Sequence, residues 1–197
     1  MLNNTGKTQR LVGMSIFTAL VVVLQLIATF IKFGPFSITL ALTPIVVGSA
    51  LYGTKSGAWL GGVFGVVVLL MSITGAEVGG AALWAVNPIL TAVLCILKGA
   101  AAGFAAGLVY NWLAKKHRTA AVFAAGIVSP VVNTGIFCAA LVLFYRPTLA
   151  AWAGGTDVVY YIFFVLIGVN WLVEMAVNAV LSPVVVRIVE ARMKGVV

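Results

Sequence analysis

Charged and amide side chains lie inside apolar runs that are long enough to cross a bilayer. Lys98 and Glu174 lie deep in two of these runs, and Asn133 lies in another. A charge facing lipid costs at least about 2.5 kcal/mol, so Lys98 and Glu174 should face a bundle interior or a cavity. Asn170, Glu174 and Asn178 are spaced by four residues. This spacing places them on one face of a helix.

Two roles are open for these residues. In the first, Lys98 and Glu174 pair and fix the register of their helices, while the asparagines hydrogen-bond between helices. In the second, they line a site for a polar solute, and the Lys98 ammonium receives a carboxylate of that solute. The two roles are compatible, and the sequence favours neither one alone.

Aromatic residues gather near the predicted outer ends of the apolar runs, among them Tyr145 and Tyr161. An interfacial aromatic belt is the ordinary explanation. A ring-lined pocket that opens outward is the alternative. We therefore include both tyrosines, with Asn87, in a candidate substrate-binding set: Asn87, Lys98, Asn133, Tyr145, Tyr161, Asn170 and Glu174.

Motifs of catalysis are missing from the sequence. It contains no HExxH, no GxSxG and no paired intramembrane aspartates. The stretch GSALYGTKS nearly resembles a P-loop, but Thr54 separates Gly53 from Lys55 and breaks the required Gly-Lys order. Cys95 and Cys138 stand apart in apolar runs, which predicts neither a disulfide nor a metal site. We expect no enzymatic activity, no cofactor and no ATP hydrolysis by this chain.

The amino-acid composition indicates that the chain lies in a lipid bilayer. Of its 197 residues, 63% are hydrophobic and only 8% are charged, whereas about a quarter of a soluble domain is charged. Because roughly 20 apolar residues cross a bilayer as a helix, we predict an all-α integral membrane protein that forms a single domain over 1–197. The predicted six transmembrane helices are 11–31, 36–52, 56–73, 82–113, 119–145 and 158–186. The last three exceed the minimum length, so tilts, kinks or projecting ends are expected.

The positions of the basic residues predict which ends of the six spans face the cytoplasm. With both termini in the cytoplasm, only Lys32 and Arg146 fall in outer loops. Basic residues are expected on the inner side, and the inner segments hold Lys7, Arg10, Lys55, Lys115, Lys116, Arg118, Arg187, Arg192 and Lys194. Glu77 and Asp157 are predicted to lie in outer loops. The net charge of +8 therefore indicates topology and attraction to anionic lipid headgroups, and we expect no nucleic-acid partner.

Small residues recur at intervals of four on three predicted spans. This spacing lets helix backbones approach closely. Packing within the bundle is the ordinary interpretation of the glycine ladders, and a docking face for another subunit is the alternative. The ladders are Gly57, Gly61 and Gly65 on the third span and Gly99, Gly103 and Gly107 on the fourth, and Ser15 and Ala19 form a pair on the first.

The chain resembles the substrate-binding S components of energy-coupling factor (ECF) vitamin transporters over nearly its whole length. The resemblance rests on the six-span plan, the length and several local patterns. These are RLVGMSIFTAL, FGPFSITLALTPIVVGSALYGTKSGAWLGGVFG, LKGAAAGFAAGLVYNWLAKK, SPVVNTG and VNWLVEMAVNAVLSPVVVRI. The patterns are diffuse, and together they are fairly specific.

The resemblance implies a multi-pass protein of a bacterial plasma membrane that binds a micronutrient near its outer face. It also implies docking onto a membrane T component that two cytoplasmic ATPases drive. The family's Ala-xxx-Ala docking motif reads Ser15-xxx-Ala19 here, which keeps the residues small. Members of the family carry different vitamins. The Lys98 cation could receive a carboxylate, which favours pantothenate, whereas the aromatic outer ends could stack on the ring of riboflavin. An autonomous small secondary carrier or channel is the alternative function.

Overall fold

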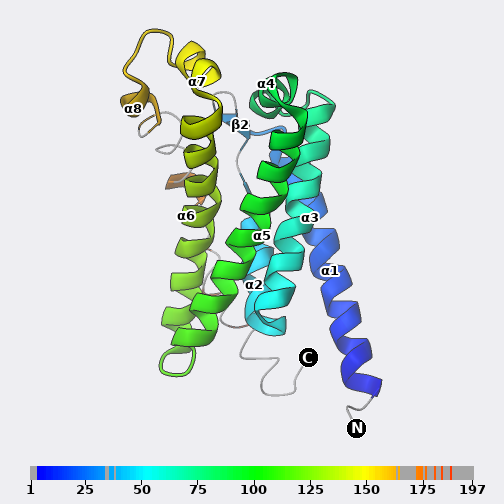
Figure 1. The fold of residues 1–197 in the computed structure, drawn as a ribbon. Coiled ribbons are helices and arrows are strands. Elements are labelled where there is room, and N and C mark those ends of the chain that lie inside the picture. The colour runs from blue at the N-terminus through cyan, green and yellow to red at the C-terminus, as the bar shows by residue number, and fades with distance from the viewer. Residues whose placement is uncertain are drawn as a thin grey trace.

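The computed structural model describes residues 4–33, 36–37, 39–162, 164, 172–174, 176, 180, 183 and 187. This part is a bundle of helices with one pair of two-residue antiparallel strands (Figure 1). The elements are α1 (Asn4–Ala28), β1 (Lys32–Phe33), β2 (Phe36–Ser37), α2 (Leu42–Tyr52), α3 (Thr54–Ile73), α4 (Val78–Val86), α5 (Pro88–Leu113), α6 (Arg118–Phe144), α7 (Arg146–Ala153) and α8 (Val158–Tyr160).

Four helices of the described chain are long and apolar enough to cross a membrane. Their spanning segments are Lys7–Ala28, Thr54–Ile73, Pro88–Leu113 and Arg118–Phe144. These agree with four of the predicted spans and support the all-helical membrane class. The bulk of the predicted sixth span, 158–186, lies outside the described residues.

The predicted span 36–52 is wrong as a continuous helix. Its first residues form β2, and the helix α2 covers only the 11 residues Leu42–Tyr52. At 1.5 Å per residue, α2 is about 17 Å long, against a hydrocarbon thickness of about 30 Å. Hydropathy alone could not show this difference, because an apolar extended segment and an apolar helix have the same mean hydropathy.

The predicted span 82–113 is also wrong as one helix, because the chain breaks at Asn87. The backbone of Asn87 is extended, with φ −152° and ψ 97°, and its side chain accepts a hydrogen bond from the Leu90 N–H at 3.0 Å. Pro88 then occupies the first position of α5, where a missing N–H costs nothing. Asn87 is thus the N-cap of α5, and α4 is a separate short helix.

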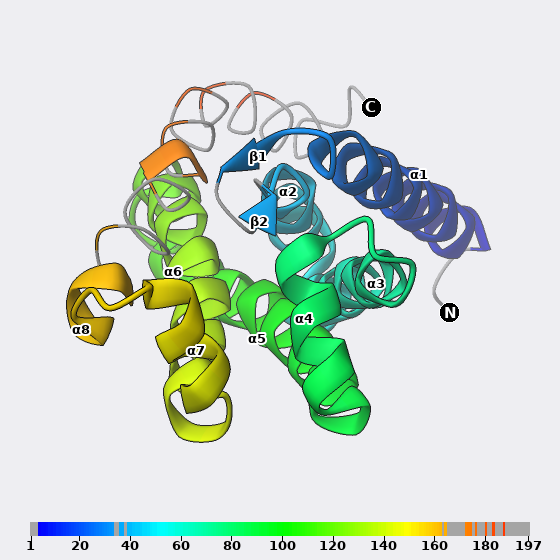
Figure 2. The same ribbon diagram turned by 90° about the horizontal axis from the view of Figure 1, so that it is seen from above.

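The glycine ladders pack α3 against α5, as the ordinary interpretation predicted. A Cβ atom built at Gly61 would overlap the carbonyl oxygen of Gly99, and one at Gly57 would overlap that of Gly103. A Cβ at Gly65 would stand 2.7 Å from the Cα of Ile96. Seen from above, α5 lies between α3 and α6 (Figure 2). The glycines therefore let α5 occupy the centre of the bundle.

The turns and short elements that connect the long helices lie at two opposite ends of the bundle. Gly53, with φ 92°, joins α2 to α3 in a turn that a side chain would strain. This turn, the start of α1 and the α5–α6 turn lie at one end, while the strands, α4 and α7 lie at the other (Figure 1). The basic residues Lys7, Arg10, Lys55, Lys115 and Lys116 therefore share one end of the molecule.

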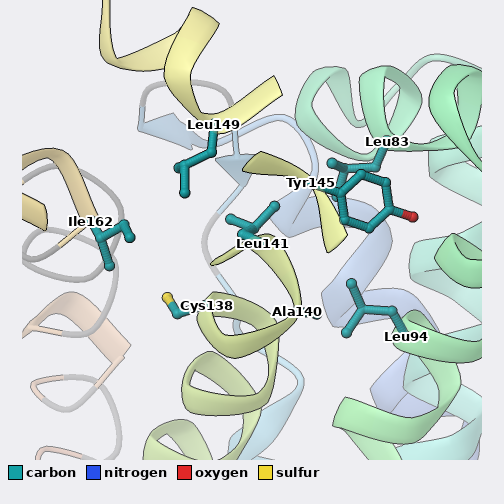
Figure 3. Close-up of a cluster of buried hydrophobic side chains, with 8 residues drawn as sticks. All are labelled: Leu83, Leu94, Cys138, Ala140, Leu141, Tyr145, Leu149 and Ile162. Carbon is teal, nitrogen blue, oxygen red and sulfur yellow. The ribbon is translucent and has the colours of Figure 1, made fainter. Parts of the chain in front are cut away.

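An apolar cluster holds the opposite end together (Figure 3). Tyr145, 1% exposed, packs there with Leu83 of α4 and Leu141 of α6. Its hydroxyl lies 2.8 Å from Thr91 Oγ1 and 3.3 Å from the carbonyl oxygen of Asn87. The cluster, which fixes the α4–α5 break against α6, consists of Leu83, Leu94, Cys138, Ala140, Leu141, Tyr145, Leu149 and Ile162.

Helix α1 is the least buried of the four candidate spans. Only 17% of its apolar window is buried within the bundle, compared with 50% for α3. Leu11, Ile16 and Ile27 are all at least half exposed. Such an apolar face is typical of a surface that meets lipid or another protein.

Candidate functional site

A polar cavity of about 70 Å³ lies inside the bundle. Residues from α1, α3, α4, α5 and α6 line it, together with Glu174. Its wall on α5 comes from the first turns of that helix, so the cavity lies in the half of the bundle opposite the basic turns. The lining residues are Gln25, Ser37, Thr39, Phe64, Val68, Ser72, Glu77, Gly80, Leu83, Thr91, Leu94, Cys95, Lys98, Asn133, Thr134, Phe137 and Glu174.

The Lys98 ammonium is held against two aromatic rings of the cavity wall. Its Nζ atom lies 5.0 Å from the centroid of Phe137 and 5.9 Å from that of Phe64. Within about 6 Å, a ring face attracts a cation, more strongly where water is excluded. The rings thus stabilise a positive charge that remains available to the cavity.

Glu174 brings a carboxyl group to the same cavity. Its side chain is 4% exposed and is hydrogen-bonded by Thr39. Its Oε2 atom has no hydrogen-bond partner within the part of the chain that the structure describes. Lys98 and Glu174 therefore line one cavity, as their cost in lipid requires. Pairing of Lys98 with Glu174 and binding of a solute by Lys98 both stay predictions.

Two more acceptor atoms in the cavity wall lack partners among the described residues. They are Oε1 of Gln25 and Oδ1 of Asn133, on side chains that are 3% and 4% exposed. Buried polar atoms are nearly always hydrogen-bonded, and leaving one unsatisfied costs about 1–3 kcal/mol. Together with Glu174 Oε2, they make a set of acceptors that a solute with several donors would satisfy.

Glu77 lies in this site, although the sequence placed it in an outer loop. It is 6% exposed, and its carboxylate accepts hydrogen bonds from the Ser37 N–H at 3.0 Å and the Ser37 hydroxyl at 2.5 Å. Glu77 does lie between α3 and α4, as the sequence predicted, and its burial there is an addition from the structure. This contact ties strand β2 to the residue that precedes α4.

Glu77→Ala is expected to destabilise the fold by about 2 kcal/mol, because the buried Ser37 N–H would lose its acceptor and the Ser37 hydroxyl would keep only the Thr29 carbonyl oxygen at 3.3 Å. Glu77→Gln keeps one acceptor oxygen and should lose about half as much. Thermal unfolding of the purified variants in detergent measures both. Wild-type stability for Glu77→Ala would mean that the contact contributes nothing.

The predicted site residues fall into three groups. Lys98, Asn133 and Glu174 meet at the cavity. Asn87 and Tyr145 are outside its lining and engage in the contacts described above, and Tyr161 packs beside the apolar cluster, half-buried. Asn170 lies outside the described residues. A role in binding for the last four stays a prediction.

Sequence reasoning missed several lining residues. Gln25 could have been found, because an amide inside the first apolar run carries the same signal as Asn133. Ser37, Thr39 and Thr91 carry no such signal, since hydroxyl residues are common in membrane helices and in loops. Only the fold brings them to the cavity.

The architecture defines a class: a helical membrane protein with a cavity near one end of its bundle that is lined by charged and polar side chains. The sequence pattern of the family described as "ECF transporter, substrate-specific component" matches residues 9–186. The chain therefore belongs to that family. It is a multi-pass membrane protein and a non-enzymatic, substrate-binding subunit of an ECF transporter. No curated protein matches the chain.

Proposed function

We propose that the cavity binds a vitamin or related micronutrient for ECF-driven import. The observation that carries this proposal is the convergence of a cation that faces the cavity with three buried acceptor atoms that lack partners among the described residues: Lys98 beside Gln25, Asn133 and Glu174. A purely structural cavity would be expected to satisfy its own polar atoms. A solute would satisfy these.

The complementary solute carries an anionic group for Lys98 and several N–H or O–H donors for the acceptors. Pantothenate has a carboxylate, hydroxyl groups and an amide N–H, and so matches this set. Riboflavin offers donors and a ring, but the rings of Phe64 and Phe137 already face the Lys98 ammonium. The charge pattern therefore favours pantothenate over riboflavin.

Binding requires the cavity to widen. Its volume of about 70 Å³ is well below the roughly 300 Å³ at the lower end of small-molecule sites. The wall includes the short helix α4 and residues 37 and 39, which precede α2. These short elements can move at smaller cost than the glycine-packed pair of α3 and α5.

Mass spectrometry of small molecules retained by the purified protein, followed by calorimetric titration, tests the proposed ligand. We expect pantothenate to be retained and to bind with one site per chain, and riboflavin to bind far more weakly. Retention of an uncharged compound, with no heat from pantothenate, would contradict the anionic ligand. Binding of no micronutrient at all would contradict the proposed use of the cavity.

We further propose six spans with both termini in the cytoplasm. The basic turns at one end support this orientation, and it places the cavity toward the outer face. The remaining spans would be the segment 36–52, partly extended, and 158–186. A membrane-impermeant thiol reagent on intact cells tests the orientation: a cysteine introduced at exposed Thr156 should react, and one at exposed Lys116 should not. The reverse pattern would contradict it.

The proposed partners are a membrane T component and two cytoplasmic ATPases. Ser15 and Ala19 are both exposed on α1, and the Ser15 hydroxyl is satisfied within the helix by the Leu11 carbonyl at 3.0 Å. The pair therefore offers a flat, small surface without an unmet polar group. This is the property that close helix approach requires.

Ser15→Leu and Ala19→Leu are expected to reduce copurification with the T component at least tenfold, because a bulky side chain separates the helices. Ligand binding by the isolated chain should be unchanged. Ala139→Leu on α6 is the matched control, since it adds similar bulk at another exposed alanine. Equal losses for all three variants, or none, would place the docking face elsewhere.

A further inference from the structure

We propose that a groove between the starts of α1 and α3 is a binding site for the headgroup of an anionic phospholipid. The groove has a volume of about 420 Å³ and is separate from the polar cavity. Lys7 and Arg10 of α1 and Lys55 of α3 line it, with Ser56, Leu11 and Trp59. Three cations around one groove are the chemistry that recognises a phosphate.

Arg10 is positioned before any ligand arrives. Its Nη2 atom donates to Ser56 Oγ at 3.1 Å and to the Tyr52 carbonyl oxygen at 3.4 Å. These bonds hold the guanidinium against the α2–α3 turn. Within the described part of the chain, its other N–H groups donate no further hydrogen bond and can meet a ligand. Less conformational entropy is then lost on binding than for a freely moving side chain.

Among the described residues, the groove is lined by basic side chains and by no acidic one. Glu77 and Glu174 line the cavity in the opposite half of the bundle, and Asp157 caps α8 beyond α7. Like charges held close together repel each other, so an anion bound among them lowers the energy of the group.

Apolar side chains beside the cations favour a lipid as the source of the phosphate. Leu11 is 68% exposed and Trp59 is 63% exposed. A tryptophan next to basic residues is typical of the membrane interface. The headgroup phosphate would lie among the cations while an acyl chain follows the apolar surface of α1 and α3.

Native mass spectrometry of the full chain with equal phosphatidylglycerol and phosphatidylcholine tests this site. The wild type should retain one phosphatidylglycerol preferentially. Lys7→Gln with Lys55→Gln should lower that retention roughly 30-fold, since each basic residue near an anionic lipid contributes about a factor of 5. Lys115→Gln with Lys116→Gln, at the α5–α6 turn, removes the same charge at the same end and is the control.

The control pair should change retention less than about threefold, because it lies outside the groove. Equal losses for both pairs would show general attraction to charge and overturn the site. Displacement of the lipid by millimolar inorganic phosphate would show a site for free anions and overturn it as well. Thermal unfolding checks that both variants are folded, and micronutrient binding should be unchanged in both, so this test is independent of the proposed cargo.

Discussion

Gly61→Ala is expected to be among the most destabilising single changes in the protein, although it adds one methyl group. The new Cβ would overlap the carbonyl oxygen of Gly99 on α5. Neither backbone can yield locally, because Gly57 and Gly65 hold the same two helices together on either side. Overpacking a tight interior costs about 1–3 kcal/mol, and we expect the upper end here because the obstacle is backbone.

Gly62→Ala is the matched control for this prediction. Gly62 lies next to Gly61 on α3, and nothing stands within 4 Å of a Cβ built there. Its stability should stay within about 0.5 kcal/mol of wild type. Reversible unfolding of the purified variants in mixed micelles measures both. Similar stability for the two variants would mean that α3 and α5 do not pack through this ladder.

Lys98→Met is expected to lower ligand affinity about 100-fold while the protein stays folded, because truncating one partner of a buried, charged hydrogen bond costs about 2–5 kcal/mol of binding. The ammonium lies over the rings of Phe137 and Phe64, which come from side chains that pack without it, so we expect the helix contacts to remain in Lys98→Met. Calorimetric titration gives the affinity, and thermal unfolding reports the fold.

The double variant Lys98→Met with Glu174→Gln separates the two roles of this lysine. If Lys98 only pairs with Glu174, the single change should destabilise the fold, and the double change should restore much of the loss, as coupled neighbours do. If Lys98 receives the anionic group, the second change should not restore binding. Lys98→Arg keeps the charge and should retain more affinity than Lys98→Met. Unchanged affinity in Lys98→Met would remove the argument for an anionic ligand.

The sequence predicted the helical membrane class and six spans, and four of the six correspond to long apolar helices of the described chain. Long apolar runs have few other solutions in a bilayer. The predicted helix bounds were wrong where one or two residues determine whether the backbone continues as a helix. Asn87 followed by Pro88 is a helix start inside an apolar run, and the capping bond at Leu90 makes it a break. The extended start of the second span has no counterpart in hydropathy, since its residues are as apolar as those of α2.

The same contrast holds for the site. Lys98, Asn133 and Glu174 were predicted from their cost in lipid, and the fold brings them to one cavity. Glu77 was assigned to the segment between the third and fourth predicted spans, where it lies, and its place in the site was not predicted. Its burial depends on Ser37, forty residues away in the sequence, and such a tertiary contact cannot be inferred from either residue alone.

Uptake into proteoliposomes tests the central claim most directly, using the compound that the purified protein retains. We expect the chain alone to bind that compound without accumulating it. Accumulation should appear only when the T component and both ATPases are reconstituted with it and ATP is supplied. Sustained accumulation by the chain alone, driven by an ion gradient or by none, would contradict the account and favour an autonomous carrier or channel.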